Sequence, residues 1–176
     1  FTIRNRGPNI RIGKSGKKPE SFTKITFYQA QLYKEKMEGS GASDVSLSYV
    51  ATGVAEVKYG NKKTNPNVQV LATDENYSLT AGYTVAQGRN FNETEIENAA
   101  SVAIIGEDVA QLLFAKATAL GKIIQVRNKR FRVIGVLESK GSSFGFGGDN
   151  ILWVPITNAR QSFGASSTSF TVNTMA

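Results

Sequence analysis

A chain of 176 residues can form one large domain or two small ones, and at this length a substantial hydrophobic core is possible. The composition, 40% hydrophobic and 20% charged, is typical of a globular protein, and no apolar run approaches the roughly 20 residues of a membrane-spanning helix. The absence of Cys and His excludes disulfides, thiolate nucleophiles, Cys/His zinc sites and the commonest general base near neutral pH. Because the chain begins at Phe1 without Met, we expect it to be part of a longer protein.

The net charge of +7 is concentrated near the N-terminus. Residues 1–36 carry nine Lys or Arg against two Glu, whereas residues 37–176 carry twelve of each sign. Residues 1–19 therefore form a predicted basic arm, which either meets an anionic surface or is a solvated, extended segment. We expect no nucleic-acid partner, because no aromatic residue interleaves the basic ones as a stacking platform would require. The basic candidates are Arg4, Arg6, Arg11, Lys14, Lys17 and Lys18.

In chain order, the first predicted helix follows Thr26, because Thr26-x-x-Gln29 matches a capping box, and it ends at Gly39. Residues 44–72 alternate between polar and apolar side chains and contain the turn signal Gly60-Asn61. This pattern predicts antiparallel strands with one face in the core.

The second half of the sequence predicts short elements of both kinds. Residues 92–98 form either a loop or one helical turn, and no βαβ rhythm repeats. The expected fold class is therefore α+β, with mixed or antiparallel sheets and short helices. The remaining predicted elements are strands at 101–105, 122–126, 131–137, 151–154 and near 169–172, and helices at 107–115 and 156–163.

The glycine-rich stretch of residues 141–149, GSSFGFGGD, contains the hydrolase pattern G-x-S-x-G around Ser143. Without His the usual triad is excluded, and a dyad with Lys140 would need a helix after Ser143 that glycine disfavours. The stretch also lacks the helix that a phosphate-binding loop requires. Aromatic rings in such a loop are poorly placed for the core, so Phe144 and Phe146 are candidate partner-contact residues.

Acidic residues occur in three clusters, and paired carboxylates can hydrolyse glycosides or bind metals. The alternative, which we favour, is that these clusters are solvated acidic segments. We therefore expect no catalytic residues, no cofactor site and no metal site. The clustered acids are Asp74 and Glu75, then Glu93, Glu95 and Glu97, then Glu107 and Asp108.

A series of segments has a distinctive order: Gly88-Arg-Asn-Phe91, Val102-Ala-Ile-Ile-Gly106, Val109-Ala110, Leu113-Phe114, Leu120-Gly-Lys122-Ile123, Phe131-Arg-Val-Ile-Gly-Val-Leu137, Lys140-Gly141, Asp149 and Val154-Pro155. Over about residues 25–163, this series resembles the periplasmic core domain of MacB-type ABC transporter permeases, within the wider FtsX-like group. The N-terminal FTIRNRGPNIRIGKSGKK resembles the segment just outside the first transmembrane helix of such permeases.

The resemblance implies a porter-like α/β subdomain of residues 20–72 and 151–176 and an inserted subdomain of residues 73–150, preceded by the basic arm. The family pattern continues with a further strand and helix, which leaves open whether the porter-like part is complete. The implied role is that of a non-enzymatic, periplasmic domain of an inner-membrane efflux permease. Such a domain couples cytoplasmic ATP hydrolysis to periplasmic export or release.

The resemblance also implies partners. They are a second permease subunit in a dimer, a cytoplasmic ATPase, a periplasmic adaptor or carrier protein and, through the parent protein, the membrane. The alternative interpretation is a free-standing periplasmic module that binds a ligand or peptide, or acts as a sensor.

Overall fold

The computed structural model describes residues 1–4, 23–40, 44–115, 117–141, 149–164 and 169–175. The helices are α1 (Phe27–Gly39), α2 (Tyr77–Thr80), α3 (Glu93–Glu97), α4 (Glu107–Phe114) and α5 (Ile156–Phe163). The strands are β1 (Thr2–Ile3), β2 (Val45–Ala55), β3 (Val57–Tyr59), β4 (Lys62–Lys63), β5 (Val68–Thr73), β6 (Val85–Gly88), β7 (Val102–Ile105), β8 (Ile123–Val126), β9 (Lys129–Leu137), β10 (Ile151–Pro155) and β11 (Thr171–Thr174).

Within these residues the strands form one mixed sheet in the order β1-β11-β2-β5-β10-β7-β9-β8-β3-β4, and β6 also pairs with β9. The β5–β10 and β7–β9 pairs are parallel, and the other pairs are antiparallel. The expected class of mixed and antiparallel sheets with short helices is confirmed.

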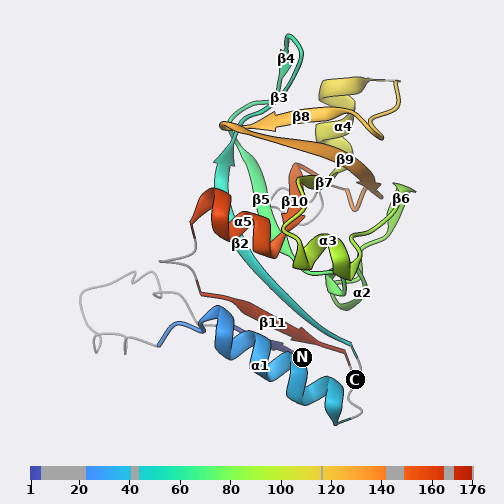
Figure 1. Ribbon diagram of the computed structural model, residues 1–176. Helices are drawn as coiled ribbons and strands as arrows, with labels where there is room; N and C mark the ends of the chain where they lie inside the picture. The colour runs from blue at the N-terminus through green and yellow to red at the C-terminus, as the bar shows by residue number, and fades with distance from the viewer. Residues whose placement is uncertain (5–22, 41–43, 116, 142–148, 165–168, 176) are drawn as a thin grey trace, which may run out of the picture.

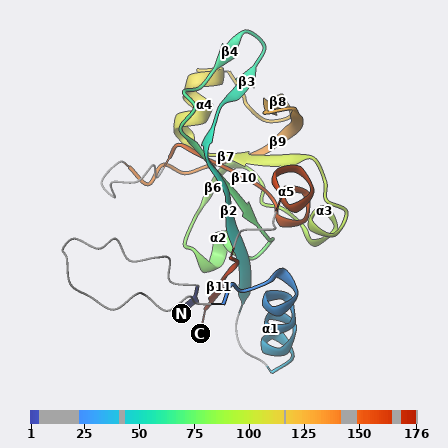
Figure 2. The same ribbon diagram turned by 90° about the vertical axis from the view of Figure 1, so that its left-hand side faces the viewer.

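The molecule is elongated, with the β3–β4 hairpin at one end and α1, β11 and both chain ends at the other (Figure 1). Helices α1, α3 and α5 lie on one side of the sheet, and α2 and α4 lie on the other (Figure 2). No described helix is long and apolar enough to cross a membrane.

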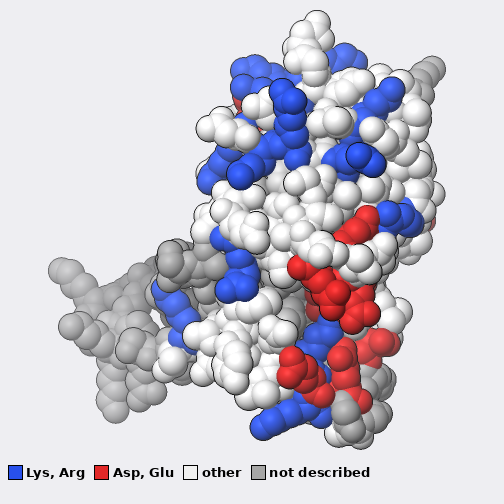
Figure 3. Space-filling model, viewed as in Figure 1, with Lys and Arg blue, Asp and Glu red and all other residues white. Residues whose placement is uncertain are grey.

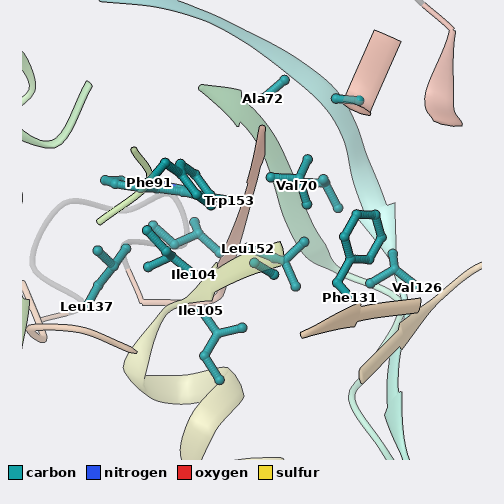
Figure 4. Packing of buried hydrophobic residues seen from close by; sticks show 14 of the residues in the cluster. Val70, Ala72, Phe91, Ile104, Ile105, Val126, Phe131, Leu137, Leu152 and Trp153 are labelled. Carbon is teal, nitrogen blue, oxygen red and sulfur yellow. The ribbon is translucent and has the colours of Figure 1, made fainter. Parts of the chain in front are cut away.

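Strand β10 runs through the middle of the sheet, between β5 and β7, and all five of its residues are buried. Its run of apolar residues fits a strand that is covered on both faces. Figure 4 shows how Val70 of β5, Ile104 of β7 and Leu152 of β10 converge in the core. The fully buried Trp153 is paired in register with Leu71 on one side and Ile104 on the other.

Local sequence signals account for several element ends. The capping box at the start of α1 is confirmed: the Thr26 hydroxyl accepts from the Gln29 amide at 3.3 Å, and the Gln29 side chain accepts from the Thr26 amide at 3.0 Å. Gly60, with φ +58°, lies in the turn between β3 and β4, as its sequence predicts.

Two details differ from expectation, and the choice between loop and helical turn at residues 92–98 is decided in favour of the helix. The turn between β8 and β9 is shorter than residues 127–130, because pairing continues to Val126 and resumes at Lys129, with Arg127 at φ +53°. Residues 93–97 form a helix, because Asn92 and Glu95 make a second capping box there. The last strand begins at Thr171, two residues later than expected.

The sheet runs without interruption through both predicted subdomains. Strand β10 pairs with β5 of the porter-like part along one edge and with β7 of the inserted part along the other. Backbone hydrogen bonds therefore join the two parts directly. The division of the chain at residues 73 and 151 stays a prediction.

Candidate functional site

The sequence-based candidate residues fall mostly outside the described part of the chain. Phe144, Phe146 and Ser143 lie there, as do the other basic candidates of the arm, Arg6, Arg11, Lys14, Lys17 and Lys18. Arg4 is described and exposed, directly after β1, which pairs with β11. These residues remain candidates for partner and membrane contacts.

The two ends of the glycine-rich stretch are held together by Asp149. Its carboxylate accepts hydrogen bonds from the Ser139 hydroxyl at 2.5 Å and from the amides of Lys140 and Gly141 at 2.9 and 3.2 Å. Burial alone would raise the pKa of Asp149, but these three hydrogen bonds favour the charged form and hold its pKa below the ordinary value. The residues on either side of the stretch that contains Phe144 and Phe146 are thus hydrogen-bonded to one another.

An aromatic side chain contacts Lys140, which adjoins the glycine-rich stretch. The Lys140 ammonium lies 3.5 Å from the centre of the Tyr83 ring, at cation–π distance, and 3.4 Å from the Ala81 carbonyl oxygen. Tyr77 and Tyr83 both pack edge-on against Trp153 in the core, with ring centres 5.1 and 5.0 Å away. Lys140 is thereby tied to the core through Tyr83, and its contacts give it a structural role.

Asp149→Ala is expected to lower the free energy of unfolding by about 2–3 kcal/mol, because the hydrogen bonds that residues 139–141 donate to a charged carboxylate are lost. Urea denaturation followed by tryptophan fluorescence would measure this, since Trp153 is fully buried. Asp149→Asn is the matched control: its amide oxygen still accepts, so the loss should be smaller. Equal stability of Asp149→Ala and the unchanged chain would contradict this role.

A cleft of about 640 Å³ lies beside α1, α3 and the start of α5. Its apolar lining includes Phe27, Leu47, Ile96 and Ile156. The acids that line it are Glu35, Glu38, Asp74, Glu75, Glu93 and Glu97.

Lys34 lies among these acids and forms ion pairs with two of them. Its ammonium is 3.0 Å from Asp74 and 2.5 Å from Glu75. Burial lowers the pKa of Lys34, but the two carboxylates outweigh burial and hold the pKa above its ordinary value. The Asp74–Glu75 cluster is thus part of an ion-pair network with α1, not the solvated segment expected from sequence.

Asp74 is the most deeply buried member of this network. Its side chain is 3% exposed, and its Oδ2 also accepts from the Leu47 amide at 2.7 Å. Burial raises its pKa to about 6, while Lys34 acts in the opposite direction. No group of three or more acids among the described residues is arranged to hold a metal ion.

In the remaining acidic cluster of this region, Glu95 is paired, whereas Glu93 and Glu97 are exposed. Glu95 forms a bidentate ion pair with Arg89, at 2.8 and 2.7 Å, and also caps α3.

Figure 3 shows that Asp and Glu gather beside α1 and α3, whereas Lys and Arg gather at the other end, over β3, β8 and β9. Sequence analysis missed this second basic region because it summed charge over residues 37–176; residues 122–132 alone carry five Lys or Arg and no acid, a local signal that could have revealed it.

Comparison with known proteins identifies the family. The family described as "MacB-like periplasmic core domain" matches residues 2–176. The chain belongs to this family. The MacB-like resemblance of the sequence is therefore confirmed, and with it the assignment to an extracytoplasmic transporter domain.

Curated relatives carry the same domain type within longer proteins. The chain is 34% identical over 154 residues to the macrolide export ATP-binding/permease protein MacB of Bdellovibrio bacteriovorus, covering 88% of this chain and 23% of that protein. It is 36% identical over 109 residues to the pyoverdine export ATP-binding/permease protein PvdT of Pseudomonas savastanoi, covering 61% and 16%. The chain thus spans less than a quarter of the length of these relatives.

Solved structures share the fold. The periplasmic region of MacB from Actinobacillus actinomycetemcomitans superposes with a TM-score of 0.67 at 18% identity, covering 81% of this chain and 63% of that one. The extracellular domain of the noncanonic ABC-type transporter YknZ from Gram-positive bacteria gives 0.64 at 25% identity, covering 81% and 73%. The periplasmic region of one transporter and the extracellular domain of another therefore share this architecture at low sequence identity.

Proposed function

We propose that this MacB-like domain couples cytoplasmic ATP hydrolysis to substrate export or release on the periplasmic side of the inner membrane. It would act through partner contacts and perform no chemistry of its own. The observation that carries the proposal is the family match over residues 2–176, together with relatives that are named as export ATP-binding/permease proteins.

The position of the chain ends supports this role. The Thr174 amide donates to the Phe1 carbonyl at 2.8 Å, and the Thr2 hydroxyl donates to the Asn173 side chain at 2.9 Å. Residues near the two ends of the sequence therefore lie side by side (Figure 1), an arrangement that suits a domain inserted between two membrane helices. The basic arm would then lie near the membrane, where Arg4 and its neighbours meet lipid phosphates at about 1 kcal/mol each.

The continuous sheet supports mechanical coupling. One path of paired strands leads from β1 and β11, beside the chain ends, to β4 at the opposite end. A movement imposed at the membrane end would reach the far end through backbone hydrogen bonds and packed side chains. We propose that it acts there on an adaptor or carrier protein, within a transporter that contains a second permease subunit and an ATPase.

Replacing both Phe144 and Phe146 with Ser in the full-length transporter tests the partner contact. We expect export to fall about tenfold, as when aromatic anchors of an interface are removed, while ATP hydrolysis in detergent is retained. Transport assays in cells and ATPase assays on the purified protein would measure the two. Thermal unfolding of the isolated chain would show whether the fold is intact.

The matched control is Leu112→Ser, which removes an exposed apolar side chain on α4. Its export rate should not change. Loss of the fold in the Phe144/Phe146 variant would show that these rings belong to the core, and unchanged export would exclude them as partner contacts.

A further inference from the structure

Strand pairing brings basic side chains from distant parts of the sequence onto one face of the sheet. Arg130 of β9 is paired with Gln125 of β8, Gln125 with Lys58 of β3, and Lys58 with Lys63 of β4. Directly paired residues point to the same face, so these four side chains form one row across four strands. At the usual spacing between strands the row is about 14 Å long.

A second pair extends this surface along the strands. Arg132 is two residues from Arg130 and therefore points to the same face, and it is paired with Ile123. All six side chains are exposed. We call this surface the basic face; it consists of Lys58, Lys63, Ile123, Gln125, Arg130 and Arg132.

The opposite face of the same strands is built differently. Ile124, Val126 and Phe131 alternate with the exposed residues and are fully or almost fully buried. Phe114 of α4 packs on that side against Tyr59, with ring centres 4.6 Å apart. The alternation thus assigns one face to the core and leaves the other, with four cations, to solvent (Figure 3).

One acid, Glu56, forms ion pairs with the two lysines of the basic face. The Glu56 carboxylate lies 3.0 Å from Lys58 and 3.1 Å from Lys63, and hydrogen bonds from both lysines lower its pKa. The lysines are themselves 52% and 66% exposed. Arg130 and Arg132 form no ion pair within 4.0 Å with any described residue.

We propose that the basic face is a docking surface for an acidic segment of a partner protein. The planar guanidinium groups of Arg130 and Arg132 suit bidentate contacts with carboxylates. Lys58 and Lys63 add positive charge to the same surface. Exposed Ile123 supplies apolar contact between the charges.

The position of the basic face favours a protein partner over a lipid surface. The face lies over β3, β8 and β9, at the end of the molecule opposite the chain ends (Figures 1 and 3). This step rests on the proposed function, in which the chain ends adjoin the membrane. The basic face would then point away from lipid and toward periplasmic proteins.

The test is binding of a capped, fluorescently labelled hexaglutamate peptide to the full 176-residue chain, measured by anisotropy at low salt. Arg130→Gln combined with Arg132→Gln should weaken binding about fivefold or more, because two exposed ion pairs are lost. Glu56→Gln should strengthen binding, because it removes the acid that competes for Lys58 and Lys63. Lys36→Gln on α1 is the matched control and should leave binding unchanged.

Vesicles of phosphatidylglycerol and a 12-nucleotide single strand of DNA serve as comparison probes. The proposal is overturned if the arginine pair and Lys36→Gln have equal effects, or if either comparison probe binds through Arg130 and Arg132 more tightly than the peptide. Thermal unfolding of each variant would confirm that the sheet is intact. Failure here would leave the export test of Phe144 and Phe146 unaffected, so the two proposals can fail separately.

Discussion

Gly88→Ala is expected to lower the free energy of unfolding by about 3–4 kcal/mol, from overpacking and left-handed backbone strain together. Gly88 has φ +79°, and a Cβ there would lie 2.1 Å from the Ile134 carbonyl oxygen and 2.7 Å from the Leu120 side chain. The Ile134 carbonyl cannot easily move, because it lies within β9 and accepts from the Arg89 amide at 3.1 Å. Urea denaturation of the variant would measure the loss.

Gly121→Ala is the matched control for this substitution. Gly121 has a similar φ of +75°, but no atom lies within 4 Å of the position that its Cβ would occupy. The cost there should be about 1–2 kcal/mol, from backbone strain alone. Equal losses in the two variants would show that β6 does not approach β9 as closely as the structure has it.

This close approach explains two of the glycines in the sequence series that resembles the MacB-like family. Gly88 of β6 is paired with Gly135 of β9, and a Cβ on Gly135 would lie 2.6 Å from the Arg89 carbonyl oxygen. Strand β6 therefore approaches the paired strand β9 most closely where both strands have glycine. From sequence alone these glycines were family markers without a physical reason.

Local signals were sufficient to place most elements. The Thr26 capping box, the Gly60 turn and the buried run of residues 151–154 each depend on neighbours in the chain, so sequence alone predicts them. The start of β11 depends on its pairing with β2, where Thr171 meets Ser48, and it was predicted two residues early. Elements that depend on distant partners are the ones whose ends sequence analysis places least well.

The site features depend even more on distant pairing. Lys34 reaches Asp74, which is 40 residues away, so their ion pair has no local signal. The basic face joins two hairpins, β3–β4 and β8–β9, each of which is locally rich in Lys and Arg, but the sequence does not show that the two hairpins lie side by side. The antiparallel β3–β8 pair that joins the two hairpins was not predicted, and neither were the parallel pairs β5–β10 and β7–β9, because nothing in a short window specifies which strand lies beside which.

Asp74→Asn is expected to change how stability depends on pH. Burial raises the pKa of Asp74 to about 6 in the folded chain, against an ordinary value of 3.8. A carboxyl whose pKa is raised by folding stabilises the fold fully below the ordinary pKa, and this contribution is lost as the pH rises through the folded pKa. At 1.36 kcal/mol per pKa unit, the whole contribution is about 3 kcal/mol, of which about 2 kcal/mol is lost between pH 4 and pH 7, because pH 4 already lies above the ordinary pKa.

The amide introduced by Asp74→Asn cannot ionise, yet its oxygen can still accept from the Leu47 amide, so the substitution removes the titration while keeping the contact. The stability of this variant relative to the unchanged chain should therefore rise by about 2 kcal/mol from pH 4 to pH 7, as measured by urea denaturation. Asp108→Asn removes an exposed carboxylate and controls for the change in net charge. If both variants show the same pH profile, burial does not penalise the charged form of Asp74, and Lys34 fully compensates it.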